Sequence, residues 1–283
     1  MKQSIGIIGA GWLGQPLAQT LIEQGCDVVV TGQSEQRLAE FAQLNLNHHQ
    51  LSLPQRPELL AKLPALQQRV LIIAIPPQIK RGKADYPEKI ANLVSAAEIS
   101  GVKQIILLNS TAIANGLEGE VNEFTELNLT ADKVAILAEA ENELLKFTGD
   151  AQILRLSGLV GPKRHPGRFI SPEREFSAPE QPVNLIHQAD VIGLLLAMLN
   201  KGSLGSSGKL DSEHRIYHGV SQTHLSRREY YRAAAAALGR PTPKFSQEQS
   251  ERTGKVITDD WTRAQLEYDY QYDDLSTWLT EVN

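Results

Sequence analysis

Short apolar runs alternate along this chain with longer stretches in which apolar residues recur at helical spacing. The strand-like runs are Ile5–Ile8, Val28–Thr31, Val70–Ile75, Gln104–Asn109 and Gln152–Leu156. The stretches that predict helices are Leu13–Gln24, Glu35–Leu44, Tyr86–Ser100 and Thr130–Phe147. Strands that alternate with helices are typical of a parallel sheet covered by helices, and βαβ crossovers are right-handed. We therefore expect an α/β fold with a doubly wound parallel sheet.

The alternation stops beyond about Arg155. The prolines that punctuate the next stretch are Pro162, Pro166, Pro172, Pro179 and Pro182. They predict a long irregular connection, of a kind that often covers or lines a site. The elements predicted after it are a helix over Asp190–Asn200, a strand over Arg215–His218 and a helix over Ser226–Leu238, with an exposed loop at Gly202–Gly208. We predict one domain over 1–160 and a smaller C-terminal region over 161–283, some segments of which return to the first.

A Gly-x-Gly-x-x-Gly motif follows the first predicted strand. Its first glycine permits a tight turn, the second lets the backbone approach a pyrophosphate, and the third lets the next helix pack on the strand. The helix N-terminus offers N–H groups and the positive end of its dipole to an anion. We predict that a dinucleotide binds at Gly9, Gly11, Trp12, Leu13 and Gly14. A purely structural glycine turn is the alternative.

The residues after the second predicted strand bear on the choice of nicotinamide cofactor. An acidic residue there would accept hydrogen bonds from the adenosine ribose. Residues 31–34 (Thr-Gly-Gln-Ser) contain no carboxylate, and Arg37 follows one turn later. We predict NADP, with NAD possible, and Ser34 and Arg37 as ligands. The structural alternative is that Ser34 caps a helix and Arg37 is a solvated surface charge.

A proline-rich turn follows the third predicted strand. Ile75, Pro76 and Pro77 give a rigid backbone that lacks two N–H donors and can lie against the cofactor. A simple loop-forming turn explains the same residues. The position at a strand end favours neither interpretation over the other, and we include the three residues in the predicted cofactor site.

Composition excludes several classes of protein. The 283 residues, 41% of them hydrophobic and 22% charged, suffice for a globular core. A net charge of -5 and a pI near 5.8 leave no basic surplus for DNA or RNA. The single cysteine, Cys26, cannot form an internal disulfide. No signal peptide precedes the glycine motif, and the apolar run Val191–Leu199 is too short for a bilayer. We expect a cytoplasmic protein without membrane or nucleic-acid partners, of undetermined oligomeric state.

Four segments, taken in order, carry a resemblance to a known family. They are the glycine motif, Leu108–Thr111, Leu154–Pro162 and Val183–Val191. Together they resemble atypical extended short-chain dehydrogenase/reductases, a group that includes NAD-dependent epimerase/dehydratase-like proteins. The resemblance implies a Rossmann-type domain with a small C-terminal substrate domain. The segment Arg164–Phe169 is similar to that of a bacterial subgroup whose substrate is commonly unassigned.

The family's chemistry depends on a Tyr-x-x-x-Lys pair, in which the lysine lowers the pKa of the tyrosine. No tyrosine of this chain has a lysine four residues later, and the expected helix reads Thr130–Val134 without a tyrosine. The resemblance leaves Lys133 to reach the nicotinamide ribose, and Ser110 and Thr111 to hold a substrate oxygen. A solvated helix residue is the alternative for Lys133.

The irregular segment after the sheet carries a cationic group. This group is suited to binding an anionic substrate and consists of Arg164, His165 and Arg168. An equally good interpretation is that these residues are solvated surface charges. His165 or a bound water would replace the missing tyrosine as proton donor. His187 and Asp190 lie at helical spacing near a predicted helix start, and we favour a structural pair in which Asp190 caps the helix or holds His187.

A metal site has little support. His48 and His49 are adjacent, so their side chains diverge on a strand. His214 and His218 are four residues apart, which suits a metal only on a helix, whereas we predict a strand there.

Two functions of different classes follow. The first is an NAD(P)-binding oxidoreductase or epimerase/dehydratase-like enzyme that acts on a small, anionic substrate. The second is a non-catalytic NADP(H)-binding sensor or regulatory module that controls a partner. The second is motivated by the missing tyrosine, because the glycine motif binds the cofactor whereas the tyrosine transfers the proton.

Overall fold

A computed structural model describes residues 3–171, 173, 175–203, 214–246 and 253–281. The chain forms two compact units. The first comprises the described residues of Met1–Ile113, Leu129–Leu154 and Ser206–Ile216, and the second those of Ala114–Asn128, Arg155–Gly205 and Tyr217–Asn283. The chain changes from the first unit to the second at 154–155, and the segment 114–128 also belongs to the second unit.

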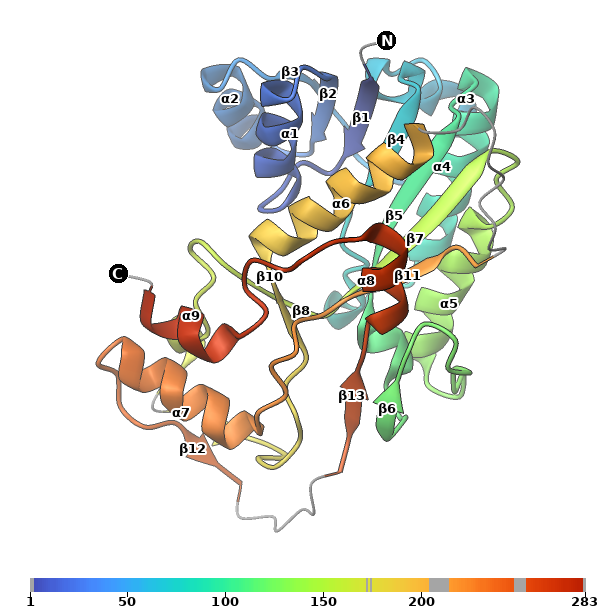
Figure 1. Cartoon of the computed structure of the whole chain (residues 1–283). Coiled ribbons are helices and arrows are strands. Elements are labelled where there is room, and N and C mark those ends of the chain that lie inside the picture. The colour runs from blue at the N-terminus through green and yellow to red at the C-terminus, as the bar shows by residue number, and fades with distance from the viewer. Residues whose placement is uncertain (1–2, 172, 174, 204–213, 247–252, 282–283) are drawn as a thin grey trace. The chain divides into compact units, whose positions relative to one another are not determined.

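The central sheet has seven strands in the order β11-β7-β5-β4-β1-β2-β3 (Figure 1). Their bounds are β1 (Ser4–Ile8), β2 (Asp27–Gly32), β3 (Asn47–Gln50), β4 (Val70–Ile73), β5 (Gln104–Ser110), β7 (Asp150–Leu156) and β11 (Ile216–Gly219). The pairs from β3 through β5 are parallel. This confirms the predicted α/β fold. The five predicted strands of the first half are β1, β2, β4, β5 and β7, and β4 ends two residues earlier than predicted.

Amphipathic helices join these strands. They are α1 (Gly14–Glu23), α2 (Glu35–Gln43), α3 (Pro57–Leu60), α4 (Tyr86–Ser100) and α5 (Asp132–Leu144). In α1, the residues Leu17, Ala18 and Leu21 form one buried face, as their spacing predicts. Helix α1 connects β1 to β2, and helix α4 connects β4 to β5. These two connections run toward opposite edges of the sheet. Because such crossovers are right-handed, α1 and α4 lie on opposite faces of the sheet.

Strand β3 is absent from the sequence prediction. Its residues are Asn47, His48, His49 and Gln50, none of which is apolar. It lies at the edge of the sheet, and among the described strands it pairs with β2 alone. An edge strand needs little apolar surface, so the alternation that marks a half-buried strand does not arise.

The described part of the second unit contains three small parallel strand pairs. They are β8 (Gly158–Val160) with β10 (Leu185–His187), β9 (Glu175–Phe176) with β12 (Lys244–Phe245), and β6 (Gly119–Val121) with β13 (Lys255–Ile257). Its helices are α6 (Gln188–Ser203), α7 (Arg227–Ala237), α8 (Asp260–Leu266) and α9 (Leu275–Glu281). Helices α6 and α7 match the predictions. Of the predicted loop at Gly202–Gly208, the first two residues belong to α6, and the rest lies outside the described residues.

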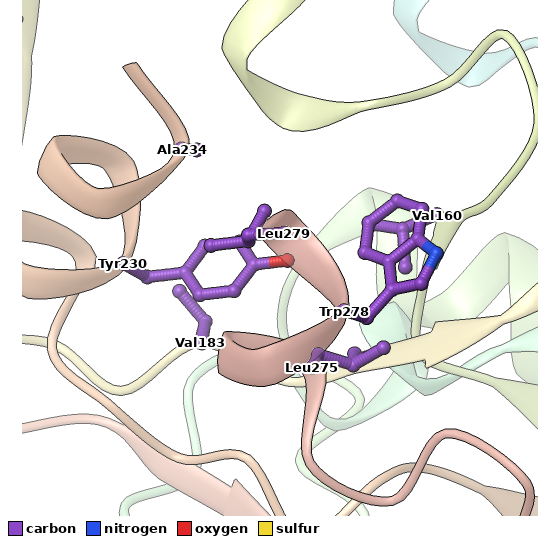
Figure 2. Close-up of a cluster of buried hydrophobic side chains, with 7 residues drawn as sticks. All are labelled: Val160, Val183, Tyr230, Ala234, Leu275, Trp278 and Leu279. Atoms are coloured by element: carbon purple, nitrogen blue, oxygen red, sulfur yellow. The ribbon is translucent and has the colours of Figure 1, made fainter. Parts of the chain in front are cut away.

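An apolar cluster holds α7 and α9 together in the second unit (Figure 2). Its members are Val160, Val183, Tyr230, Ala234, Leu275, Trp278 and Leu279. Burial of each large side chain in such a cluster contributes about 1.5–3 kcal/mol. Within the described part of the chain, no helix has both the length and the apolar character that a membrane span needs.

Candidate functional site

A cavity of ≈ 470 Å³ lies in the first unit at the carboxyl ends of β1, β2 and β4. Its walls include residues 8–14 after β1, residues 31–34 at the end of β2 and residues 74–76 after β4. Strands β1 and β4 are neighbours, but the chain leaves them toward opposite edges of the sheet. Ligands of open α/β sheets bind in the crevice at such a switch point, and the volume suits a small ligand or cofactor.

The turn after β1 is fixed to β2 by two hydrogen bonds. Gly9 has a φ of +92°, a conformation that side chains rarely adopt. Its N–H donates to Thr31 Oγ1 at 3.0 Å, and the N–H of Ala10 donates to the Thr31 carbonyl oxygen at 2.9 Å. Thr31 therefore holds the turn in place. It lies at the end of β2, where NAD-binding Rossmann folds usually carry an acidic residue.

The three glycines of the motif have different surroundings. A Cβ on Gly14 would lie 3.0 Å from the Gly9 carbonyl oxygen and 3.3 Å from Ile7 Cγ2, so this glycine lets α1 approach β1. A Cβ on Gly11 would meet nothing within 4 Å, although Gly11 lines the cavity. Packing within the protein thus disfavours a side chain at position 14, whereas no described atom restricts position 11.

Ser34 and Arg37 both line the cavity and both have structural contacts. Ser34 is the N-cap of α2, because its Oγ accepts the N–H of Arg37 at 3.3 Å. Arg37 Nη1 donates to Glu40 Oε2 at 2.6 Å and to Gln15 Oε1 at 3.3 Å. The capping role expected as an alternative is therefore confirmed for Ser34, and it coexists with a position on the cavity wall.

The charged residues that line the cavity all carry positive charge. They are Arg37, Lys83 and Lys89, in a chain whose net charge is -5. Such a lining favours an anion. Sequence reasoning missed the two lysines because they belong to the charged segment before and within α4, where a lysine usually faces solvent.

The wall contains other residues that were expected and some that were not. Ile75 and Pro76 line the cavity, whereas Pro77 does not and stays a prediction. Leu51 and Leu53 also line it, just beyond β3. Because β3 itself was not predicted, nothing in the sequence placed these two leucines at the same edge of the sheet as the glycine turn.

Ser110, Thr111 and Lys133 lie in the first unit but outside the cavity lining. Ser110 ends β5, and its Oγ accepts the N–H of Ala112 at 3.1 Å. Thr111 is buried. Lys133 is in the first turn of α5, where burial, and secondarily the charge of Lys80, lower its pKa. Both effects favour the neutral amine, so Lys133 releases its proton more readily than an ordinary lysine.

His165 is locked into the second unit. It is 1% exposed, its Nδ1 accepts the N–H of Gly167 at 3.1 Å, and its Nε2 lies 3.2 Å from the Leu279 carbonyl oxygen. Because Nδ1 is an acceptor, Nε2 carries the proton and donates it to that carbonyl. Burial lowers the pKa of His165, and the charge of Arg168 lowers it further. The surroundings favour a structural role over the predicted role as proton donor.

The two arginines beside His165 differ in exposure. Arg168 is exposed, and Arg164 is partly buried. Gly167 lies between them and packs tightly on α7, since a Cβ there would lie 2.3 Å from the Ala234 carbonyl oxygen. His165 and Gly167 therefore fix the segment that carries both arginines.

Asp190 has a structural role, as expected, but with other partners. Its carboxylate accepts the Tyr268 hydroxyl at 3.0 Å and the N–H groups of Gln271 and Tyr272 at 2.6 and 3.1 Å. The ring of Tyr272 lies against His187, with centroids 3.9 Å apart. Asp190 thus positions the aromatic neighbour of His187. Burial lowers the pKa of His187 to about 4.

No group of three or more His, Cys, Asp or Glu side chains among the described residues is arranged to hold a metal ion. His218 lies on β11, as predicted, where its Nδ1 is 3.0 Å from the Thr258 carbonyl oxygen. His214 lies just before that strand.

Comparison with known proteins agrees with a dinucleotide site. The sequence profile of a family described as NAD(P)H-binding matches residues 9–201, beginning at the glycine motif. Protein YeeZ of Escherichia coli K12 is 31% identical to this chain over 280 residues, which cover 96% of this chain and 97% of that protein.

Solved structures match the fold over almost the whole chain. A putative NAD-dependent epimerase/dehydratase from Methylobacillus flagellatus has a TM-score of 0.76 at 22% identity, and the match covers 98% of this chain and 95% of that one. A UDP-glucuronic acid 4-epimerase from Bacillus cereus, in complex with NAD, has a TM-score of 0.73 at 15% identity, with 98% and 96% covered. At these identities the likeness concerns the fold alone.

Proposed function

This chain belongs to the NAD(P)H-binding protein family, and from this premise we propose that it is an NADP(H)-dependent oxidoreductase or epimerase/dehydratase. Its substrate is a small anion. The observation that carries the proposal is Gly11, which lines the cavity with open space where a Cβ would stand. The cofactor's pyrophosphate fits there, beside the first N–H groups of α1 and among cationic side chains.

Ser34 and Arg37 support NADP as the preferred cofactor. Both line the cavity beyond the end of β2, and none of the described residues that line it carries a carboxylate. A serine hydroxyl and a guanidinium suit a 2′-phosphate, whereas the ribose of NAD is usually held by an acid. The Bacillus cereus neighbour is in complex with NAD, so both cofactors belong in the test.

The chain's own residues must bind the substrate and transfer a proton. When bound, the nicotinamide supplies or accepts a hydride. Ser110 is suited to donating to a substrate oxygen, because the N–H of Ala112 already occupies one acceptor position and fixes the hydroxyl. Thr111, the next residue, orients the substrate with it. Lys133 is suited to proton transfer, since its pKa is lowered.

Arg164 and Arg168 supply the charge for the anionic substrate. A guanidinium binds a carboxylate or phosphate with two parallel hydrogen bonds. His165 serves this binding by holding the segment through Gly167 and Leu279. We assign it a positioning role and leave the proton transfer to Lys133.

Turnover tests the enzymatic proposal. NADPH oxidation is measured against small anionic carbonyl compounds, and epimerisation against sugar nucleotides, starting with UDP-glucuronic acid. Lys133→Met should lower kcat and remove a basic limb from the pH profile, whereas Lys103→Met, an exposed lysine before β5, should change neither. Equal kcat values in these two variants would contradict the role of Lys133.

A binding module without catalysis is the second candidate. It is favoured by the missing Tyr-x-x-x-Lys pair and by the two hydrogen bonds that engage both ring nitrogens of His165. Such a module would bind NADP(H) and control a partner. A protein that co-purifies with this chain only when NADP(H) is present would support it, and robust turnover would exclude it.

A further inference from the structure

Lys89 is buried on the wall of the cavity, where a lysine is unusual. It lies in the first turn of α4, is 7% exposed and lines the cavity. Lysine is among the residues that are least often buried unless they are paired. The positive end of the helix dipole also disfavours a cation in a first turn. A cation at this position therefore depends on its partner, Asp85.

Asp85 holds the ammonium group of Lys89. Lys89 Nζ donates to Asp85 Oδ1 at 2.7 Å, and Asp85 stands immediately before α4. The side chain of Asp85 is 31% exposed, whereas that of Lys89 is 8% exposed. The carboxylate of the pair is therefore nearer to solvent, and the ammonium group is the more deeply buried end. An ammonium has three N–H donors, and the bond to Asp85 uses one. A bound anion in the cavity can accept the others.

The cationic residues of the cavity fall into two groups. Arg37 follows β2, whereas Lys83 and Lys89 follow β4, and the glycine turn after β1 lies between these strands in the sheet order. NADP also carries its phosphates in two places, the 2′-phosphate on the adenosine and the diphosphate that joins the two nucleosides. Arg37 suits the first and the lysine group suits the second.

We infer that Lys89, positioned by Asp85, is the residue that binds the cofactor's diphosphate opposite the glycine turn and contributes most of the charge-dependent affinity for it. This inference rests on the proposed cofactor site and names the residue of that site that binds the diphosphate. Asp85 is a positioning residue, because it touches Lys89 and holds the ammonium at the wall. Lys83 is exposed and adds a weaker, solvent-screened charge.

Calorimetry with three ligands tests the assignment. NADP⁺ carries both phosphate groups, ADP-ribose carries the diphosphate alone, and adenosine 2′-monophosphate carries the 2′-phosphate alone. Lys89→Met should weaken NADP⁺ and ADP-ribose by about tenfold and adenosine 2′-monophosphate by less than about threefold, as expected for loss of one charge-assisted contact. Arg37→Ala should give the opposite pattern, weakening adenosine 2′-monophosphate and leaving ADP-ribose unchanged.

Further variants separate charge from folding. Lys89→Arg should retain most of the affinity for ADP-ribose, and Asp85→Asn should lower it less than Lys89→Met does. If Lys89→Met unfolds, Asp85→Asn combined with Lys89→Met removes both charges and gives the same ligand pattern. Lys62→Met, at an exposed lysine after α3, is the matched control.

Two results would overturn the inference, and they differ in what they say of the cofactor site. If the unmodified protein binds NADP⁺ and Lys89→Met binds each of the three ligands as tightly as the unmodified protein does, the assignment of Lys89 is wrong and the cofactor site stands. If the unmodified protein binds none of the three ligands, the cofactor site itself is wrong, and the inference is wrong with it.

Discussion

Arg37 Nη1 donates to Oε2 of Glu40, one turn later in α2, at 2.6 Å. Arg37 lines the cavity, and the charged residues of that lining are all cations. The two side chains are 36% and 40% exposed. An exposed ion pair of this kind contributes little, about 0–1 kcal/mol. A phosphate group that binds Arg37, as we propose for the 2′-phosphate, would therefore displace Glu40 at small cost.

Glu40→Gln should raise the affinity for NADPH by about threefold, because Arg37 loses a competing carboxylate. The affinity for NADH, which has no 2′-phosphate, should stay the same. Calorimetric titration of both nucleotides measures the difference, and Glu23→Gln, an exposed acid at the end of α1, is the control. An equal change for both nucleotides would show that Arg37 does not meet the 2′-phosphate.

Substitution by alanine should have different effects at positions 11 and 14. Gly14→Ala places a Cβ 3.0 Å from the Gly9 carbonyl oxygen and should lower the free energy of unfolding by about 1–3 kcal/mol. Gly11→Ala meets open space and should leave stability unchanged while it weakens NADPH binding. Urea unfolding and calorimetry on both variants test this, and a destabilised Gly11→Ala protein would contradict the ligand-facing role of Gly11.

Asp190 should contribute strongly to the stability of the second unit. Asp190→Ala leaves the Tyr268 hydroxyl and two N–H groups without their acceptor. The expected loss is about 2–4 kcal/mol of unfolding free energy. Gly193, one turn later in α6, makes room for the same phenol, since a Cβ there would lie 2.1 Å from its oxygen. Asp269→Ala, at an exposed acid in the same segment, should change stability by under about 0.5 kcal/mol.

Much of the fold could be predicted from the sequence, because its large elements carry strong patterns. Helix α4 begins and ends where its apolar spacing predicts, at Tyr86 and Ser100. Strand β3 could not be predicted, since a polar edge strand has no apolar face. The strands of the second unit, such as β9 with two residues, are too short to show any period.

The glycine turn on the cavity wall could be predicted better than the rest of the candidate site. The glycine motif is local, so spacing alone placed Gly9, Gly11 and Gly14. Lys89 looks like a surface charge in the sequence, and its position on the cavity wall depends on the packing of α4. One partner of His165, the Leu279 carbonyl, lies 114 residues away. No local pattern reveals such a partner.

Stability should fall as the pH drops below neutral, and His187 should account for part of the decline. The pKa of an unfolded histidine is about 6.5, whereas burial lowers the pKa of His187 to about 4 in the folded protein. Between these values the unfolded state binds more protons, so protonation favours unfolding. The stability linked to His187 is therefore complete above about pH 6.5 and is lost as the pH falls through about 4.

Denaturant unfolding at a series of pH values tests this linkage. His187→Gln should flatten the decline between pH 7 and 4, whereas His49→Gln, at a partly exposed histidine of β3, should leave its slope unchanged. Parallel curves for the unmodified protein and His187→Gln would mean that other groups cause the decline. His165, whose pKa burial also lowers, is the next residue to test.

The most direct test of the account is calorimetric titration of the unmodified protein and Gly11→Asp with NADPH and NADH. The aspartate places a negative charge where the pyrophosphate is expected, in a position with open space. Gln67→Asp, at an exposed residue before β4, controls for the added charge. We predict that the unmodified protein and Gln67→Asp bind NADPH more tightly than NADH and that Gly11→Asp binds neither. Failure of the unmodified protein to bind either nucleotide would contradict it, because the glycine turn would then serve the fold alone.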